Sequence, residues 1–351
     1  MAHISWFYAD FKNELNTSMH RVYSPSVMMS RAGYPCYVTH IAEILSGKPS
    51  TETQGAIDQS FVIVLERLLM KETHQFIKDM RSRGVKVLAT FDDNYGLMPA
   101  GAGKPYETWR GGKNAVGGRG AILNEFREGL SLCDGFMVPS RILAEDFRPY
   151  NPNPQFVPNY LLGDFWDNPP AKSPDNFMIL WGGSSAHDVS FRDSGVVPAL
   201  GQICKKYPKV YVHLQTRDPR ITRLFDKFSV RYTAHDWQPF SEWPKTVASA
   251  NLGIGPLSGN YDFRRSNLKN LEYATAGVPW VSTDAAPYAG ALGGILVNST
   301  VKDWLRAIES LIKDKVLYQR LSEEGRAWSK EFNAGAVKTY EEAFGISHSI
   351  S

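Results

Sequence analysis

The chain has 351 residues, of which 43% are apolar and 21% charged, and its formal net charge is +3. This length and apolar content suffice for two domains with cores of their own, which excludes a disordered tail protein. The small positive charge permits an anionic partner without requiring one.

The three cysteines, Cys36, Cys133 and Cys204, are widely spaced. They form no metal-binding motif and leave an odd thiol, so we expect a reducing compartment, namely the cytoplasm. The first residues lack a basic stretch followed by an apolar one, so no signal peptide is expected. No apolar run approaches about 18 residues, which predicts the absence of an integral membrane segment.

Apolar strands alternate with helices and glycine stops through the first half. The run at 61–65 is continuously apolar, as in a parallel strand covered on both faces. The stretch 70–83 predicts an amphipathic helix, and Gly84 ends it. We predict strands at 3–8, 36–39, 61–65, 85–90 and 134–139, and helices at 26–32, 70–83 and 121–132. This order indicates a Rossmann-like α/β half.

Two acidic residues, Asp92 and Asp93, come directly after the strand predicted at 85–90. Ligands of doubly wound sheets bind beyond the carboxyl ends of the strands, which is where this pair falls. Paired carboxylates bind a metal, act as a general base or orient hydroxyl groups. The alternative is that one carboxylate caps the following loop and the other is solvated.

Residues 96–120 form an unusually glycine-rich stretch after this pair. A loop of such length inside a compact domain is either functional or disordered. Cations interleaved with aromatic rings suit the clasping of a phosphate backbone and stacking on bases; the alternative is a lid kept soluble by its charges. The candidate contact residues here are Tyr95, Lys104, Tyr106, Trp109, Arg110, Lys113 and Arg119.

Six prolines between residues 152 and 174 mark a linker, and a second series of strands and helices follows it. The strand predicted at 177–181 runs into Gly182, Gly183, Ser184, Ser185 and an Ala-His pair. Small residues let a phosphate approach the backbone, although the same run also suits a simple tight turn. Further strands are predicted at 210–215, 230–232 and 252–257, with helices at 193–207, 241–250 and 305–328.

Polar residues also follow the middle strands of this half. Arg217 comes just after the strand at 210–215 and is a candidate for a cleft-facing cation. Trp237 and Gln238 lie in the loop at 234–239. Trp237 either stacks on a ligand or packs in the core, and packing is the favoured interpretation.

The segment 261–288 carries the richest set of candidates. Ser266 is a predicted N-cap of a helix that Gly277 ends, and a buried strand follows at 278–281. Arg264, Arg265 and Lys269 stand at the helix start, where backbone N–H groups and the helix dipole already favour an anion such as a diphosphate. Glu272 lies three residues after Lys269, on nearly the same face, where its carboxylate could accept two hydrogen bonds from a ribose diol. The alternative is a solvated Lys/Glu pair worth a few tenths of a kcal/mol.

Two motifs support a family resemblance. They are Ser-x-x-Lys-x-x-Glu-Tyr-x-x-x-Gly-x-Pro-x-Val at 266–281 and Trp-x-Gly-Ser-x-x-His at 181–187. Together they resemble GT-B glycosyltransferases, specifically the retaining family 4-like (group 1) enzymes of bacteria and bacteriophages. The resemblance implies that Lys269 contacts the donor diphosphate and Glu272 the ribose. It further implies that Gly183 and Ser184 bind the diphosphate and that His187 lies near phosphate or sugar.

The resemblance extends to weaker elements and also shows departures. Relatives bind the nucleobase against the loop that holds Trp237 and Gln238, while Ser266 and Asn267 join the donor site by position. In the first half, the loop after the first strand helps to bind acceptor or donor, so His20 and Arg21 become candidates, with a solvated pair as the alternative. Many relatives have a sugar-contacting Glu where this chain has Arg264, and an Asp where it has Ser190.

The implied fold is α/β of the GT-B type, with two Rossmann-like domains that face each other across a cleft. The implied bounds are 1–165 for the acceptor domain and 166–332 for the nucleotide-sugar domain. Residues 333–351 would carry a C-terminal helix that crosses back to the first domain.

The implied activity is sugar transfer from a nucleotide sugar, most simply a UDP-sugar, to an acceptor hydroxyl with retention of configuration. Arg265, Lys269 and His187 would act on the leaving diphosphate, with Asp92 and Asp93 as further catalytic candidates. No metal and no cofactor are expected, and a phage-encoded chain would act in the host cytoplasm. A carbohydrate acceptor stands slightly ahead of hydroxymethylated pyrimidines in phage DNA. The alternatives are a nucleotide-sugar 2-epimerase or hydrolase of the same fold, and a non-catalytic nucleotide-sugar-binding module.

Overall fold

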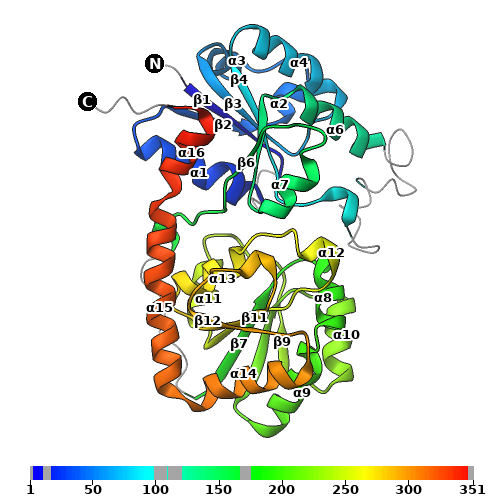
Figure 1. Ribbon diagram of the computed structural model, residues 1–351, viewed down its shortest axis with the longest axis vertical. Helices are drawn as coiled ribbons and strands as arrows, with labels where there is room; N and C mark the ends of the chain where they lie inside the picture. The colour runs from blue at the N-terminus through cyan, green and yellow to red at the C-terminus, as the bar shows by residue number, and fades with distance from the viewer. Residues whose placement is uncertain (1–2, 11–16, 99–108, 110–120, 167–174, 347–351) are drawn as a thin grey trace. The chain divides into compact units, whose positions relative to one another are not determined.

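The computed structural model describes residues 3–10, 17–98, 109, 121–166 and 175–346. These residues divide into two compact units (Figure 1). The first unit contains the described residues up to 96, from 109 to 162 and from 334 onward; the second contains 97–98 and 163–333. The chain thus changes unit after Leu162 and again at Ala334, where the sequence had placed boundaries at 165/166 and 332/333.

The first unit is built on a six-stranded parallel sheet in the order β2-β1-β3-β4-β5-β6. Its strands are β1 (His3–Tyr8), β2 (Cys36–His40), β3 (Ser60–Glu66), β4 (Lys86–Thr90), β5 (Gly135–Val138) and β6 (Pro154–Phe156). Its helices include α1 (Ser24–Arg31), α3 (Thr51–Asp58), α4 (Lys71–Ser82), α6 (Ala121–Leu132) and α7 (Arg141–Phe147). The apolar runs are buried because helices cover the sheet, and the strand order reverses between β1 and β3.

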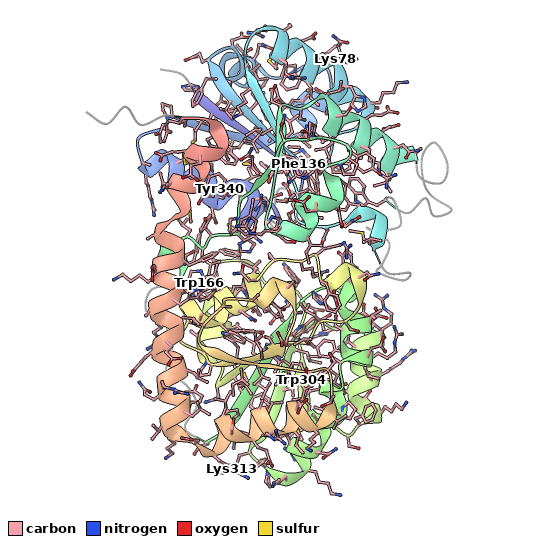
Figure 2. The ribbon with its side chains drawn as sticks, viewed as in Figure 1. Lys78, Phe136, Trp166, Trp304, Lys313 and Tyr340 are labelled. Atoms are coloured by element: carbon pink, nitrogen blue, oxygen red, sulfur yellow. The ribbon has the colours of Figure 1, made fainter. Side chains whose placement is uncertain are left out.

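The C-terminal helix α16 (Ala336–Phe344) belongs to this first unit. Its Tyr340 and Phe344 rings meet the buried Trp6 of β1 edge-on, with centroids 5.8 and 5.6 Å away. The Tyr34 hydroxyl donates to the Glu341 carboxylate (2.8 Å), and the Lys86 ammonium donates to the Ala343 carbonyl (3.0 Å). Figure 2 shows Tyr340 and Phe136 among the side chains of this unit.

The second unit is also built on a six-stranded parallel sheet, ordered β12-β11-β10-β7-β8-β9. Its strands are β7 (Phe177–Gly182), β8 (Val210–Gln215), β9 (Tyr232–Ala234), β10 (Leu252–Gly255), β11 (Trp280–Thr283) and β12 (Gly294–Val297). Its main helices are α8 (Asp188–Asp193), α9 (Val196–Lys206), α10 (Pro219–Lys227), α11 (Trp243–Ser249), α12 (Gly259–Asp262), α13 (Leu268–Thr275), α14 (Val301–Lys313) and α15 (Lys315–Ala334). The strand order reverses between β7 and β10, and ligands of such sheets bind at the carboxyl ends of strands at the reversal.

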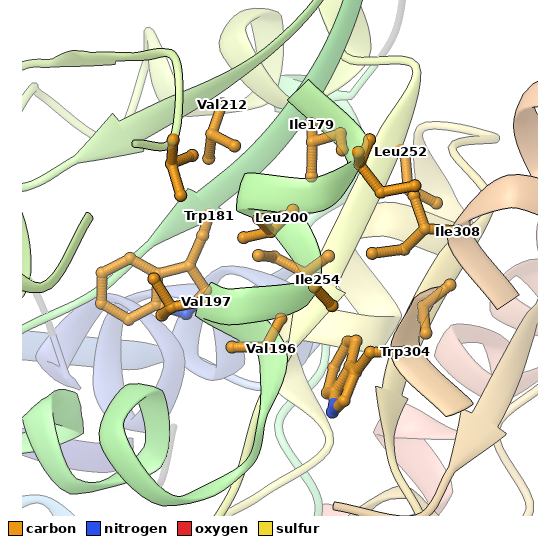
Figure 3. Close-up of a cluster of buried hydrophobic side chains, with 14 of the residues drawn as sticks. Ile179, Trp181, Val196, Val197, Leu200, Val212, Leu252, Ile254, Trp304 and Ile308 are labelled. Atoms are coloured by element: carbon orange, nitrogen blue, oxygen red, sulfur yellow. The ribbon is translucent and has the colours of Figure 1, made fainter. Parts of the chain in front are cut away.

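One core holds this sheet to its helices (Figure 3). Ile179 and Trp181 of β7 pack with Leu200 of α9 and with Trp304 of α14, and all four are fully buried. Burying a large apolar side chain stabilises the fold by about 1.5–3 kcal/mol. This core fixes the end of β7, and therefore the loop that follows it.

Several sequence expectations about the elements require correction. The helix expected at 193–207 is α9, which begins at Val196 because Gly195 adopts φ +79°, and a separate helix, α8, precedes it where none was predicted. The strand after Gly277 begins at Trp280, and Pro279 just before it has no N–H to give to a ladder. The loop expected around 19–22 is a π-helical turn (Met19–Tyr23). Across the described residues, no helix combines the length and apolarity that a membrane crossing requires.

Candidate functional site

The candidate site of the second unit starts at the carboxyl end of β7. A Cβ on Gly182 would lie 2.5 Å from the Trp243 ring, and a Cβ on Gly183 would lie 2.8 Å from the Trp181 ring. Two indole rings therefore exclude any side chain at these positions, which leaves bare backbone at the strand end. The Ser184 carbonyl then accepts a hydrogen bond from the His187 N–H (3.2 Å), so the loop turns directly into a short 3-10 segment.

Lys269 of α13 reaches this glycine backbone. Its ammonium donates to the Gly182 carbonyl and lies 5.1 Å from the centre of the Trp181 ring, a cation–π contact. Burial lowers the pKa of Lys269 to about 8; Glu272 opposes the shift, and Arg265 adds to it. The structure thus brings a partly desolvated cation to the strand end that the sequence had indicated for a phosphate.

Glu272 lies one turn further along α13 and is only 5% exposed. Burial raises the pKa of its carboxyl to about 7, against the opposing effects of Lys269 and of a hydrogen bond with Trp243. The alternative of a solvated Lys/Glu pair on a surface helix is therefore wrong. A buried carboxyl with a perturbed pKa beside a cation is a mark of functional sites.

Arg265 connects the start of this helix to the β7 loop. Its Nη1 lies 2.9 Å from Nε2 of His187, and its Nη2 donates to the Tyr261 hydroxyl at 3.2 Å. Its Nε faces a carboxylate oxygen of Asp262 at 3.3 Å. His187 is 2% exposed, and burial, Arg265 and Lys269 hold its pKa well below the usual value. His187 is therefore a neutral imidazole between two cations.

The residues just before α13 differ in part from the sequence expectation. Ser266 is not the N-cap: the helix starts at Leu268 with Asn267 as N-cap, which makes no side-chain capping bond. The Ser266 hydroxyl instead accepts from the Leu268 N–H at 3.4 Å. The Arg264 guanidinium donates to the Asn260 carbonyl at 2.6 Å, so it stabilises the preceding turn, α12.

The loops after β8 and β9 present a second group of polar residues at the carboxyl edge of the sheet. Trp237 is 58% exposed, so the expectation that it packs in the core is wrong, and its ring is open to a ligand. Arg217 is exposed and lies 3.4 Å from the Asp236 carboxylate. The Gln238 amide bonds the Thr246 hydroxyl at 2.9 Å. Beside them, the His213 and His235 rings stack at 4.3 Å.

In the first unit, Asp92 and Asp93 follow β4 as the sequence indicated. Both are half-buried, and the Thr17 hydroxyl donates to Asp92 at 3.2 Å. Burial and the charge of Asp93 raise the pKa of Asp92 to about 7, although Arg67 and Arg21 oppose the shift. The alternative in which this pair merely caps a loop and faces solvent does not describe Asp92, whose carboxyl can exchange a proton near neutral pH.

Two other acceptor candidates of the first unit, His20 and Arg21, are buried. Arg21 is 1% exposed, and its guanidinium donates to Thr90 Oγ1, Asn159 Oδ1 and the carbonyls of Val157 and Met137. His20 is buried, and burial lowers its pKa to about 4. The alternative of a solvated pair is therefore wrong for both residues, and the guanidinium of Arg21 is taken up by four strand and loop oxygens.

Two aromatic candidates of the first unit pack on each other. Tyr95 and Trp109 are both buried, and their rings stack at 4.1 Å with an interplanar angle of 13°. Each face that they share is therefore closed to a base or sugar, which contradicts the stacking role expected of Trp109. Lys104, Tyr106, Arg110, Lys113 and Arg119 lie outside the described residues.

Three participating residues were missed by sequence reasoning: Trp181 and Trp243, which close on the glycines, and Asp262, which faces Arg265. Trp181 opens the motif at 181–187 but was given no role there, and no signal marked Trp243, because tryptophans of cores and of sites look alike in a sequence. Asp262 lies three residues before Arg265, and this spacing is the one signal that could have indicated their pairing.

Comparisons with known proteins give a fold and no closer relationship. No family model matches the chain, and no curated protein matches it in sequence. Among solved structures, HepE of Anabaena in complex with UDP and glucose matches with a TM-score of 0.65 at 11% identity, over 99% of this chain and 100% of that one. Sucrose-phosphate synthase of Thermosynechococcus elongatus gives 0.64 at 14% identity over 99% and 100%. A UDP-N-acetylglucosamine 2-epimerase gives 0.56 at 12% identity over 99% and 97%.

The chain therefore has the fold of these proteins, two Rossmann-like units of the GT-B type, as the sequence predicted.

Proposed function

We propose that this protein is a glycosyltransferase that uses a nucleotide sugar, most simply a UDP-sugar, as its donor. The observation that carries the proposal is the grouping of Lys269, Arg265 and His187 around the bare backbone of Gly182 and Gly183. It lies at the carboxyl end of β7, where the strand order of the sheet reverses and ligands of such folds bind. Solved structures with this fold include one that holds UDP and glucose, which supports the same donor class.

The two cations suit a diphosphate leaving group. During transfer, the bond from the anomeric carbon to the diphosphate oxygen breaks, and its electron pair stays on the diphosphate. The acceptor oxygen bonds to that carbon and loses its proton, either to the diphosphate or to a base. Lys269 and Arg265 would stabilise the developing negative charge from a partly desolvated site, where such interactions are stronger than in water.

Glu272 would hold the ribose of the donor. A buried carboxylate can accept two hydrogen bonds from a diol, and charge-assisted hydrogen bonds of this kind contribute about 1.5–3 kcal/mol each. The exposed ring of Trp237 would stack on the nucleobase, with Gln238 beside it in the loop after β9 and Arg217, from the loop after β8, facing Asp236 of that loop.

For the acceptor we propose a carbohydrate. The feature that favoured DNA was the cationic and aromatic stretch at 104–119, but Trp109 stacks against Tyr95 and offers no open face to a base. Asp92 would orient or deprotonate the acceptor hydroxyl, since its pKa of about 7 suits proton exchange. Retention of configuration follows from the family resemblance, and the anomeric proton signal of the product tests it by NMR.

Donor binding is tested by calorimetric titration with a panel of nucleotide sugars. Lys269→Ala and Glu272→Ala should each weaken binding at least tenfold, the loss of one buried charge-assisted hydrogen bond. Lys245→Ala and Glu242→Ala are matched controls, because these exposed side chains stand at the start of α11 and bond each other at 3.1 Å. Unchanged affinity in both site variants would move the donor site elsewhere.

Turnover separates the competing activities. A glycosyltransferase consumes donor in proportion to added acceptor, whereas a 2-epimerase or hydrolase of this fold converts donor with no acceptor present. Tight binding without any turnover would instead identify a nucleotide-sugar-binding module. Binding without turnover would be consistent with Arg264, which stands where relatives carry a sugar-contacting Glu.

A further inference from the structure

The carboxylate of Asp262, at the end of α12, is the centre of a buried contact network in the second unit. It is 2% exposed. Its Oδ2 accepts from the Ser190 hydroxyl and from the Ser258 backbone N–H (3.1 Å). Its Oδ1 lies 3.3 Å from Nε of Arg265. Three segments, α8, the loop after β10 and the turn before α13, therefore meet at one carboxylate.

The Arg265 guanidinium is held on several sides by this arrangement. Asp262 lies at its Nε, the Tyr261 hydroxyl accepts from Nη2, and Nε2 of His187 lies 2.9 Å from Nη1. The guanidinium also lies over the Tyr261 ring, 4.8 Å from its centroid. A planar donor group with contacts along three of its edges cannot rotate without losing at least one of them.

The contact with His187 fixes a tautomer. Arginine carries N–H donors and has no acceptor, so Nε2 of His187 must be the unprotonated nitrogen that accepts from Nη1. Because the ring is neutral, its proton then lies on Nδ1. The tautomer thus depends on where Asp262 holds the guanidinium.

We propose that Asp262 is a positioning residue of the donor site: it holds the Arg265 guanidinium against His187, and so orients Arg265 for a nucleoside diphosphate and fixes the Nδ1–H tautomer of His187. The ligand part of this inference rests on the proposed function, whereas the tautomer part does not. Asp262 itself touches no substrate in this account; it acts through Arg265.

The test uses the full chain with ¹⁵N-labelled histidine. The chain has eight histidines, and the spectrum of His187→Gln assigns the signal of His187. Wild-type protein should show His187 only as the Nδ1–H form. In Asp262→Asn the amide oxygen still accepts from the Ser258 N–H, so the fold is kept, but the ion pair with Arg265 is lost. We expect a measurable fraction of the Nε2–H form and at least threefold weaker UDP binding.

Ser190→Ala is the matched control, because it removes one hydrogen bond to Asp262 and leaves the contact with Arg265. It should keep the wild-type tautomer. If Asp262→Asn also keeps it, or changes it without any loss of UDP affinity, the positioning role is overturned. If the tautomer shifts in Asp262→Asn while even wild-type protein fails to bind UDP, the contact network stands and the proposed donor site fails.

Discussion

The pH dependence of donor binding is the most direct measure of the site chemistry. Lys269 has a pKa of about 8 in the ligand-free chain, and only its protonated form attracts a diphosphate. Binding therefore favours the protonated state, and affinity is lost as pH rises through about 8. At pH 9 roughly one chain in eleven carries the ammonium, so the dissociation constant should be about tenfold higher than at pH 7.

Glu272 should limit donor affinity on the acid side of the same pH profile. Burial raises its pKa to about 7, so its carboxylate, which accepts two ribose hydrogen bonds, is lost as pH falls through about 7. The neutral acid retains one accepting oxygen, so the loss at pH 6 should stay under about tenfold. Affinity for a nucleotide sugar should thus be highest between pH 7 and 8 and fall on both sides.

Calorimetric titration from pH 6 to 9 measures both limbs of this pH profile. UDP-glucose is the ligand of choice, because this diester lacks the second phosphate ionisation that UDP has at pH ~6. Lys269→Arg should abolish the alkaline limb, because arginine keeps its proton throughout this range. Glu272→Gln should abolish the acid limb. An alkaline limb that persists in Lys269→Arg would refute the assignment of Lys269 as the titrating diphosphate ligand.

Three further outcomes are expected. Gly182→Ala should lower stability by about 1–3 kcal/mol in urea unfolding and weaken donor binding, because the new methyl meets the Trp243 ring at 2.5 Å. Arg21→Met should lower the free energy of unfolding by about 3 kcal/mol or more, because it removes the donor from four buried oxygens. The control Lys78→Met, at an exposed position, should lower it by under about 0.5 kcal/mol. Nucleotide-sugar affinity should be the same in excess chelator, because Lys269 and Arg265 supply the positive charge that the diphosphate requires.

Much of the candidate site could be predicted because its parts obey local rules. Gly182 and Gly183 follow an apolar strand, and Lys269 stands in the first turn of a helix that Gly277 ends. The family resemblance implied that Lys269 and the glycine loop bind the same diphosphate, and the ammonium of Lys269 does bond the Gly182 carbonyl. The N-cap was predicted at Ser266 and lies one residue later, at Asn267, because helix ends depend on dihedral angles that composition only biases.

Burial was where sequence reasoning failed. A polar pair such as His20 and Arg21 between two predicted elements suits a solvated loop, but the structure buries both. Trp237 was expected in the core and is exposed, while Trp109 was expected to be open and is stacked on Tyr95. The sequence holds nine tryptophans, and nothing in their immediate neighbours separates those of the core from those of a surface.

By itself, the sequence determined the features that neighbouring residues decide: the alternation of strands and helices, the glycine stops, and the placement of Lys269 and Glu272 on one face of α13. Only the tertiary structure decided which groups are desolvated and what faces them. Arg265 meets His187 across 78 positions, Ser190 meets Asp262 across 72, and Arg21 meets Asn159 across 138. A pKa, a tautomer or a buried hydrogen bond depends on such distant partners through burial and charge, and those act through space rather than along the chain.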